Sequence, residues 1–234
     1  MTNKPEARTG RPGTAGELTR AVGVWTLLAL IQATAWGWHQ LDRYWREPAR
    51  ALVMPLWLAV MIGGVAWKTR SSAASGRKEL RRHRMLIWWL LPVMALWYVW
   101  LPFSDAARSE GAVNAAVRWM GLMLFGGGLF LRLAAIRAQG SQFSVAVTIQ
   151  PGHRLAVSGP YQWIRHPAYA GFIGAVLGFS LVFGAVGVGI MVTVGVWLWM
   201  EDRIRDEERL LAEEFGEAYA TYRARTRKLI PFLY

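Results

Sequence analysis

The sequence predicts an all-α fold, a polytopic membrane bundle of about six transmembrane helices, and three features of its composition support this class. Apolar residues make up 54% of the 234 residues, and 24 glycines lie outside that count. A soluble domain is roughly 45–50% apolar even when glycine is counted. Charged residues make up only 18%, and tryptophan occurs 14 times in a chain whose mean hydropathy is +0.22. We therefore expect a chain that crosses the lipid bilayer repeatedly.

The net charge and the cysteine content exclude several classes of function. The net charge is +12, which in a soluble protein would point first to nucleic acid. Because the cytoplasmic loops of membrane proteins are basic, topology explains this excess, and we expect no nucleic-acid partner. Cysteine is absent, which excludes disulfides, thiol nucleophiles and Cys-based zinc sites. The four histidines are scattered along the chain, so we expect no metal site.

Apolar segments of sufficient length mark the expected spans in order. After a disordered cytoplasmic tail over residues 1–19, four apolar runs are long enough for a bilayer crossing, which takes about 17–25 residues. They cover residues 21–38, 51–67, 85–103 and 115–136. Residues 168–200 then carry no charge over 33 positions, which is too long for one crossing. Because glycine weakens a helix, Gly184 and Gly187 predict a C-terminal helical hairpin with arms over 168–183 and 186–203.

Lysine and arginine are distributed unevenly enough to predict the orientation. With the N-terminus inside, 21 of the 27 basic residues lie on the cytoplasmic side, as the positive-inside rule requires. Both termini are then cytoplasmic, and composition and length indicate a bacterial inner (plasma) membrane. The seven basic residues of the 68–84 loop fit this topology, or an anionic lipid partner, equally well. Gly126–Gly128 in the fourth span would let another helix approach closely.

The segment after the hairpin carries two carboxylates on an apolar face. We expect one helix over Glu201–Arg227 that continues out of the membrane. Its apolar stripe consists of Trp197, Ile204, Leu211, Phe215, Ala218 and Tyr222. Glu207 and Glu208 interrupt this stripe, and a buried carboxylate needs a partner. The pair is therefore either functional, or hydrated, or neutralised by a nearby arginine. The candidate arginines are Arg203, Arg205 and Arg209.

A second candidate site precedes the hairpin, in the run Ser158–Gly171. Ser158-Gly159-Pro160 is a turn signal, and Pro167 suits the first turn of the following helix. Arg165 and His166 then lie at the cytoplasmic N-terminus of the fifth span, where free N–H groups and the helix dipole attract an anion. The alternative is that Arg165 reaches lipid headgroups and His166 caps the helix. Because spans five and six form one hairpin, we expect this helix start to lie close to the two glutamates.

The two segments belong to an ordered set of residues that covers about 125–234. The set comprises Leu131-Arg132, Gly140, Phe143, Ser158-Gly159-Pro160-Tyr161, Arg165-His166-Pro167, Tyr169, Gly171, Glu207-Glu208, Phe215-Gly216, Tyr219, Tyr222, Arg225 and Leu229-Ile230-Pro231-Phe232. In this order and spacing it resembles the isoprenylcysteine carboxyl methyltransferase family, and more distantly the phospholipid N-methyltransferases. The resemblance implies an integral membrane methyltransferase that depends on S-adenosyl-L-methionine. Residues 20–114 would hold spans one to three, and residues 115–234 the catalytic region.

The same resemblance implies roles for individual residues. The cofactor pocket would be formed by Gly159, Tyr161, His166, Pro167 and Tyr169, with Glu207 and Glu208 on the ribose or amino group. Arg165 or Arg225 would orient an anionic acceptor as the catalytic arginine. The acceptor would be lipidic, or a small carboxylate or thiol, and would attack the sulfonium methyl in line. Because such a group is already nucleophilic, the protein mainly aligns the reactants and excludes water.

Two other functions compete with this interpretation. Membrane reductases of the sterol-reductase type share a similar His-Pro and tyrosine-rich C-terminal half and use NADPH, although they usually have more spans than 234 residues allow. A non-enzymatic scaffold or transport protein is the other alternative. Transporters often place ionisable sites near the midplane of the membrane, whereas the cores of spans five and six carry no charge.

Overall fold

Helices account for nearly all of the secondary structure in the computed structural model, which describes residues 14–66, 78–79, 81–109, 111–144, 148–149 and 152–231. The α-helices are α1 (Thr14–Trp36), α2 (Leu41–Arg46), α3 (Pro48–Ala51), α4 (Val53–Ala66), α5 (Arg81–Ala106), α6 (Ala115–Gln139), α7 (Pro167–Val182), α8 (Val186–Phe215) and α9 (Glu217–Arg225). Short 3-10 helices cover Trp38–Gln40, Gly140–Gln142 and Gly159–Gln162. Two strands, β1 (Lys78–Glu79) and β2 (Thr148–Ile149), pair antiparallel.

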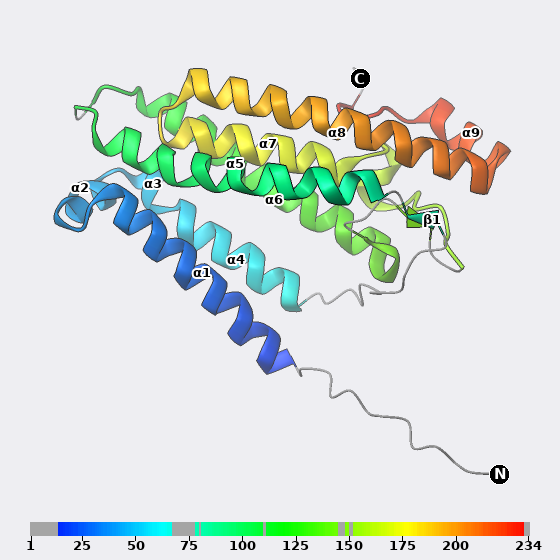
Figure 1. Ribbon diagram of the computed structural model, residues 1–234, viewed down its shortest axis with the longest axis horizontal. Coiled ribbons are helices and arrows are strands. Elements are labelled where there is room, and N and C mark those ends of the chain that lie inside the picture. The colour runs from blue at the N-terminus through cyan, green and yellow to red at the C-terminus, as the bar shows by residue number, and fades with distance from the viewer. Residues whose placement is uncertain are drawn as a thin grey trace, which may run out of the picture.

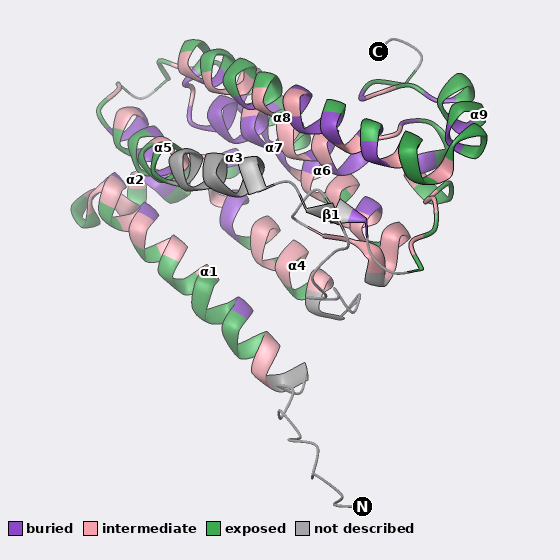
Figure 2. Cartoon of the chain, turned by 45° about the vertical axis from the view of Figure 1, so that its right-hand side comes forward, coloured by how far each residue is buried: buried purple, intermediate pink, exposed green. Residues whose placement is uncertain are grey.

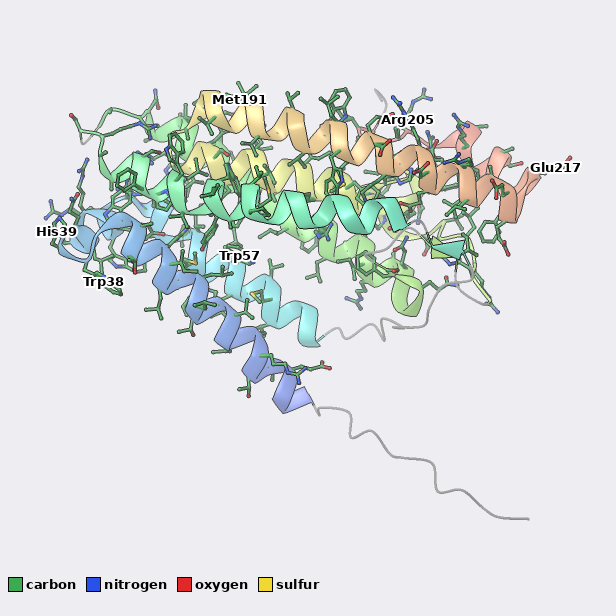
Figure 3. The ribbon with its side chains drawn as sticks, in the orientation of Figure 1. Trp38, His39, Trp57, Met191, Arg205 and Glu217 are labelled. Carbon is green, nitrogen blue, oxygen red and sulfur yellow. The ribbon has the colours of Figure 1, made fainter. Side chains whose placement is uncertain are left out.

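The long helices run between two ends of the molecule (Figure 1). One end carries α2, α3 and the α5–α6 and α7–α8 connections, whereas β1 and α9 lie at the opposite end (Figure 1). Helix α1 diverges from the bundle, so that its start lies away from the other helices (Figure 1). Helix α6 packs against α7, α7 against α8, and α1 against both α4 and α5. Side chains labelled in Figure 3 mark the two ends, with Trp38 and His39 at the first and Arg205 and Glu217 at the second.

The predicted all-α class is confirmed, and the predicted hairpin corresponds to α7 and α8. The turn between them contains Gly184 at a φ of +65°, a conformation that favours glycine. Helical segments Gly16–Trp36 and Ala115–Gln139 are long and apolar enough to cross a membrane, and Pro48–Gly64 and Pro167–Val182 are shorter apolar helices. The count of six membrane spans therefore stays a prediction, even though each expected span contains a helix.

Three details of the prediction were wrong. Helix α1 begins at Thr14, inside the expected tail, with Glu17 in its first turn, where a carboxylate favours the positive end of a helix dipole. The expected helix over Glu201–Arg227 breaks at Gly216, whose φ of +51° ends α8. Ala218 is consequently exposed, and Tyr219 is buried instead. The β1–β2 pair was not expected. Residues 1–13 of the tail and 67–77 of the basic loop lie outside the described residues.

Glycines bring α6 and α7 into close contact, as expected from the glycine run in the fourth span. A Cβ atom on Gly128 would lie 2.5 Å from the carbonyl oxygen of Gly171, so only glycine fits at this crossing. Gly126 faces Leu56 instead, and a Cβ on Gly127 would meet nothing within 4 Å. The N-terminal half of α7 is thereby held directly against α6.

A buried ion network closes the end of the bundle opposite α9. Asp105 is 1% exposed and accepts hydrogen bonds from Arg50 at 2.8 Å and from Arg118 at 2.8 Å. Arg118 also donates to the carbonyl of Val182, and Arg108 donates to that of Phe183 at 2.9 Å. The arginines thus tie α3, α5 and α6 to the α7–α8 turn.

Figure 2 shows exposed residues along the outward faces of the helices, and many of the exposed side chains are large and apolar. The most exposed large apolar side chains include Leu96 (72%), Met191 (70%), Met123 (68%) and Phe130 (64%). Soluble proteins rarely expose extended apolar surface, whereas a lipid environment accommodates it.

Candidate active site

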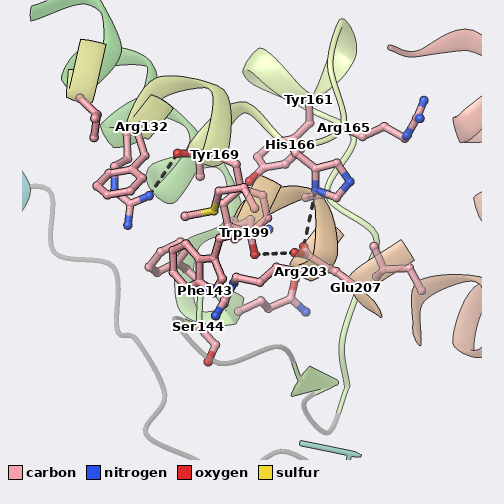
Figure 4. Close-up of a pocket in the computed structure, with 18 of the residues that line it drawn as sticks. Arg132, Phe143, Ser144, Tyr161, Arg165, His166, Tyr169, Trp199, Arg203 and Glu207 are labelled. Atoms are coloured by element: carbon pink, nitrogen blue, oxygen red, sulfur yellow. Dashed lines mark hydrogen bonds and ion pairs between the residues drawn. The ribbon is translucent and has the colours of Figure 1, made fainter. Parts of the chain in front are cut away.

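A cavity of about 650 Å³ lies between the helices, and residues of α9 form part of its lining (Figure 4). Its polar part is lined by residues that include Arg132, His153, Tyr161, Arg165, His166, Tyr169, Arg203, Glu207 and Tyr219. Its apolar part is lined by residues that include Leu28, Ile31, Trp57, Met94, Trp97, Phe172 and Val176. A single cavity therefore joins a charged region to an apolar region.

Glu208 is the centre of an ion cluster beside the cavity. Its Oε1 accepts a hydrogen bond from Nε of Arg165 at 2.8 Å and lies 3.2 Å from Nε2 of His166. Burial alone would raise the pKa of Glu208, but the hydrogen bonds from His166 and Arg165 outweigh it and lower the pKa to about 2. Glu208 therefore remains ionised and links α8 to the start of α7.

Glu207, its neighbour in the sequence, faces the cavity. Its Oε2 accepts a hydrogen bond from the Tyr169 hydroxyl at 2.7 Å, and its Oε1 lies 4.0 Å from Nδ1 of His166 (Figure 4). The rings of His166 and Tyr169 are stacked, with centroids 5.7 Å apart and planes 13° apart. The side chain of Glu207 keeps 27% of its surface exposed, so a carboxylate edge is available to a ligand.

The C-terminal segment fixes the start of α7. The backbone N–H of Arg165 donates to the carbonyl of Arg227 at 2.7 Å, and that of His166 donates to Lys228 at 3.1 Å. Nη1 of Arg165 also donates to the carbonyl of Thr226 at 2.6 Å. Nζ of Lys228 in turn lies 2.8 Å from a carboxylate oxygen of Glu201 on α8. The backbone around Arg165 and His166 is therefore held from outside the hairpin.

The structure brings together five of the nine predicted site residues as lining of the cavity: Tyr161, Arg165, His166, Tyr169 and Glu207. Glu208 lies behind them and holds two of them. Pro167 is buried in the first turn of α7, and Gly159 forms the preceding turn at a φ of +60°. Arg225 is exposed and stacks on the Tyr222 ring at 5.9 Å, so the structure does not bring it to the cavity.

The partners of the glutamates differ from the local arginines considered in the sequence. Arg205 pairs with Glu201 at 3.4 Å, and Arg209 pairs with Asp206. Arg165 and His166, which contact Oε1 of Glu208, come from a segment more than forty positions earlier in the chain, because the hairpin returns α8 to the start of α7. Arg223 of α9 lies 4.0 Å from the other carboxylate oxygen. The expectation that this helix start lies close to the glutamates is confirmed.

Arg203 and His153 also line the cavity but were not among the predicted site residues. Arg203 lies one helical turn before Glu207, and its guanidinium carbon is 5.9 Å from the Tyr169 ring centroid and 5.3 Å from that of Trp199. Residues four positions apart share one face of a helix, so the spacing of Arg203 and Glu207 was the signal in the sequence that both face the site. His153 lies in the loop before the motif, and burial lowers the pKa of its imidazole. No sequence pattern singled it out.

Known proteins are similar to the part of this chain that contains the site. Residues 119–213 match the model of the Isoprenylcysteine carboxyl methyltransferase (ICMT) family. Protein-S-isoprenylcysteine O-methyltransferase from Mus musculus is 33% identical over 122 residues, which are 50% of this chain and 43% of that protein. The Saccharomyces cerevisiae protein of the same name is 33% identical over 117 residues, 49% of this chain and 48% of that protein.

The chain thus spans less than half the length of these curated relatives. A solved structure of the eukaryotic intramembrane Ras methyltransferase ICMT superimposes with a TM-score of 0.47 at 18% identity, covering 94% of this chain and 96% of that chain. The family match falls on α6, α7 and most of α8, the helices that position the cavity's polar part. The resemblance seen in the sequence is confirmed, because residues 119–213 match the isoprenylcysteine carboxyl methyltransferase family model and half of the chain is similar to a curated protein-S-isoprenylcysteine O-methyltransferase.

Proposed function

We propose that this chain is an integral membrane methyltransferase that takes S-adenosyl-L-methionine as methyl donor and methylates the carboxylate of a lipidic, prenylcysteine-like acceptor. The observation that carries this proposal is the cavity of about 650 Å³, which is charged at one end and apolar at the other. A water-soluble cofactor suits the charged end, and an acceptor with a long apolar chain suits the other. The family match supports the reaction type.

The polar end has groups that fit the cofactor. Nδ1 of His153 and the hydroxyl of Tyr219 are buried and have no hydrogen-bond partner in the described part of the chain. Both residues line the cavity, as does the Glu207 carboxylate. Unpaired buried polar groups are costly, so they favour a ligand that brings its own donors and acceptors. Ribose hydroxyls and an ammonium group would supply them.

When bound, the cofactor supplies an activated methyl group on a sulfonium. The residues of this chain then have to align the acceptor and exclude water, because a carboxylate needs no general base. Arg165 is engaged by Glu208 and by the Thr226 carbonyl, so we assign it to holding the site in shape. Arg132 and Arg203 line the cavity, and we assign them to the negative charge of the acceptor.

The proposal includes the location of the site. The apolar exterior suits six spans in a membrane, and α9, which lies at one end of the bundle (Figure 1), contributes Tyr219 and Tyr222 to the lining of the cavity. By the distribution of basic residues, this end faces the cytoplasm of a bacterial inner membrane. The cofactor would enter from that side, and the acceptor would enter between the helices.

Cofactor titration of the purified protein tests the proposal. We expect S-adenosyl-L-methionine to bind to the wild type in a calorimetric titration, and NADPH not to bind. Glu207→Gln and His166→Ala should weaken that binding without unfolding the protein, because both side chains meet at the cavity wall. Binding of NADPH alone would favour the reductase alternative, and binding of neither cofactor would favour a scaffold or transport protein.

A further inference from the structure

Trp199 has a buried polar atom that the mechanism above does not use. Its indole Nε1 has no hydrogen-bond partner in the described part of the chain, although its ring lines the cavity. In two other tryptophans of the bundle, the indole Nε1 donates a hydrogen bond. Nε1 of Trp97 donates to Ser180 at 3.1 Å, and Nε1 of Trp25 donates to the carbonyl of Met54 at 2.8 Å. A buried donor left unpaired costs free energy, so its place beside a cavity points to a ligand.

The position of Trp199 on α8 indicates which part of a ligand it would meet. Glu207, Arg203 and Trp199 follow one another at intervals of four residues, so each lies about 6 Å further along the helix axis. The next residues on this face are Val196 and Val192, which pack in an apolar cluster with Val176. Trp199 is thus the last polar group on this face of α8 before the lining becomes apolar.

The neighbours of Trp199 favour a negatively charged oxygen. The Arg203 guanidinium lies over the Trp199 ring at 5.3 Å, and Figure 4 shows both residues with Tyr169 around the cavity. A guanidinium beside a neutral N–H donor matches the two oxygens of a carboxylate. The apolar residues beyond Trp199 would meet the chain attached to that carboxylate.

We propose that Trp199 determines acceptor specificity: its Nε1–H donates a hydrogen bond to the carboxylate of a lipidic acceptor, at the boundary between the polar and apolar parts of the cavity. This inference rests on the proposed function and assigns a further residue to its acceptor. The bond goes to the oxygen that does not attack, and therefore leaves a lone pair of the other oxygen free for the methyl group. Trp199 is a binding residue for the headgroup and takes no part in proton transfer.

The test compares two ligands on two variants. N-acetyl-S-farnesylcysteine carries the carboxylate, and N-acetyl-S-farnesylcysteamine has the same prenyl chain without it. Trp199→Phe removes the N–H and keeps an aromatic ring, and Trp25→Phe removes an N–H that is already paired outside the cavity. Binding of each ligand is measured by calorimetry in detergent micelles. The affinity for S-adenosyl-L-methionine is measured as a check that each variant is folded.

We expect Trp199→Phe to weaken binding of the carboxylate ligand about tenfold, as for loss of a hydrogen bond to a charged group. Binding of the cysteamine ligand should change less than twofold, and Trp25→Phe should bind both ligands as the wild type does. KM for the carboxylate acceptor should rise by the same factor as its Kd. Equal losses for both ligands would show that Trp199 only packs against the prenyl chain and would overturn the inference, as would wild-type affinity in Trp199→Phe. If the wild type binds S-adenosyl-L-methionine but neither prenyl ligand, the acceptor class itself is wrong.

Discussion

Replacing Glu208 by glutamine tests whether the ion cluster holds the site together. The substitution keeps the shape and one acceptor oxygen but removes the charge that Arg165 and His166 share. The pKa of Glu208 falls from 4.5 to about 2 in the folded protein, which at about 1.36 kcal/mol per pKa unit corresponds to about 3 kcal/mol in favour of the charged form. Because glutamine still accepts a hydrogen bond, we expect a loss of about 2–3 kcal/mol in the free energy of unfolding.

For a chain of this size, such a loss lowers Tm by roughly 4–12 °C. Thermal unfolding in detergent, followed by circular dichroism, measures it. The matched control is Glu213→Gln, an exposed glutamate on the same helix, which should shift Tm by less than about 1 °C. The affinity for S-adenosyl-L-methionine should also fall in Glu208→Gln, since His166 loses its anchor. A Tm equal to that of the control would refute the reasoning that this cluster stabilises the start of α7.

Three further predictions follow from the same structure. The pKa of Glu208 in the folded protein lies below its ordinary value of 4.5, so the stabilisation by its charge is complete above about pH 5 and is lost as the pH falls toward 2. The Tm values of the wild type and Glu208→Gln should therefore converge as the pH falls from 6 to 3. Parallel curves of Tm against pH would contradict this. Asp105→Asn leaves Arg50 and Arg118 buried without their carboxylate, so the free energy of unfolding should fall by about 3 kcal/mol, whereas wild-type thermal stability would show that the network is dispensable. Gly128→Ala should lower Tm, because the new Cβ meets the α7 backbone and the overpacking costs about 1–3 kcal/mol. The control is Gly127→Ala, whose Cβ would meet nothing within 4 Å. Equal Tm values in the two variants would rule out the tight α6–α7 contact.

Much of the architecture could be predicted from periodicity and length. The hairpin was readable because an uncharged run too long for one crossing contains glycines near its middle, and α7 and α8 meet there. Pro167 marked the start of α7 because proline fits a first helical turn. The break at Gly216 was missed because the apolar stripe continues in the sequence beyond it, whereas the left-handed φ of the glycine redirects the chain.

The candidate site was partly predictable for a related reason. Glu207 and Glu208 stood out because carboxylates on an apolar stripe need partners, and the hairpin topology supplied Arg165 and His166. The contribution of the C-terminal segment could not be predicted. Its contacts with Arg165 and His166 are made by backbone carbonyls, which every residue carries and no sequence pattern reveals. Trp199 was hidden for a similar reason, because only the packed structure shows that its N–H has no partner among the described residues.

Transfer of a labelled methyl group tests the central claim most directly. Purified protein in lipid nanodiscs is incubated with methyl-labelled S-adenosyl-L-methionine and N-acetyl-S-farnesylcysteine, and the product is identified by mass spectrometry. The account predicts a labelled methyl ester from the wild type and a large loss of that product in Glu207→Gln, whose carboxylate faces the cavity. Cofactor binding by the wild type without any methyl ester from this acceptor would contradict the proposed reaction.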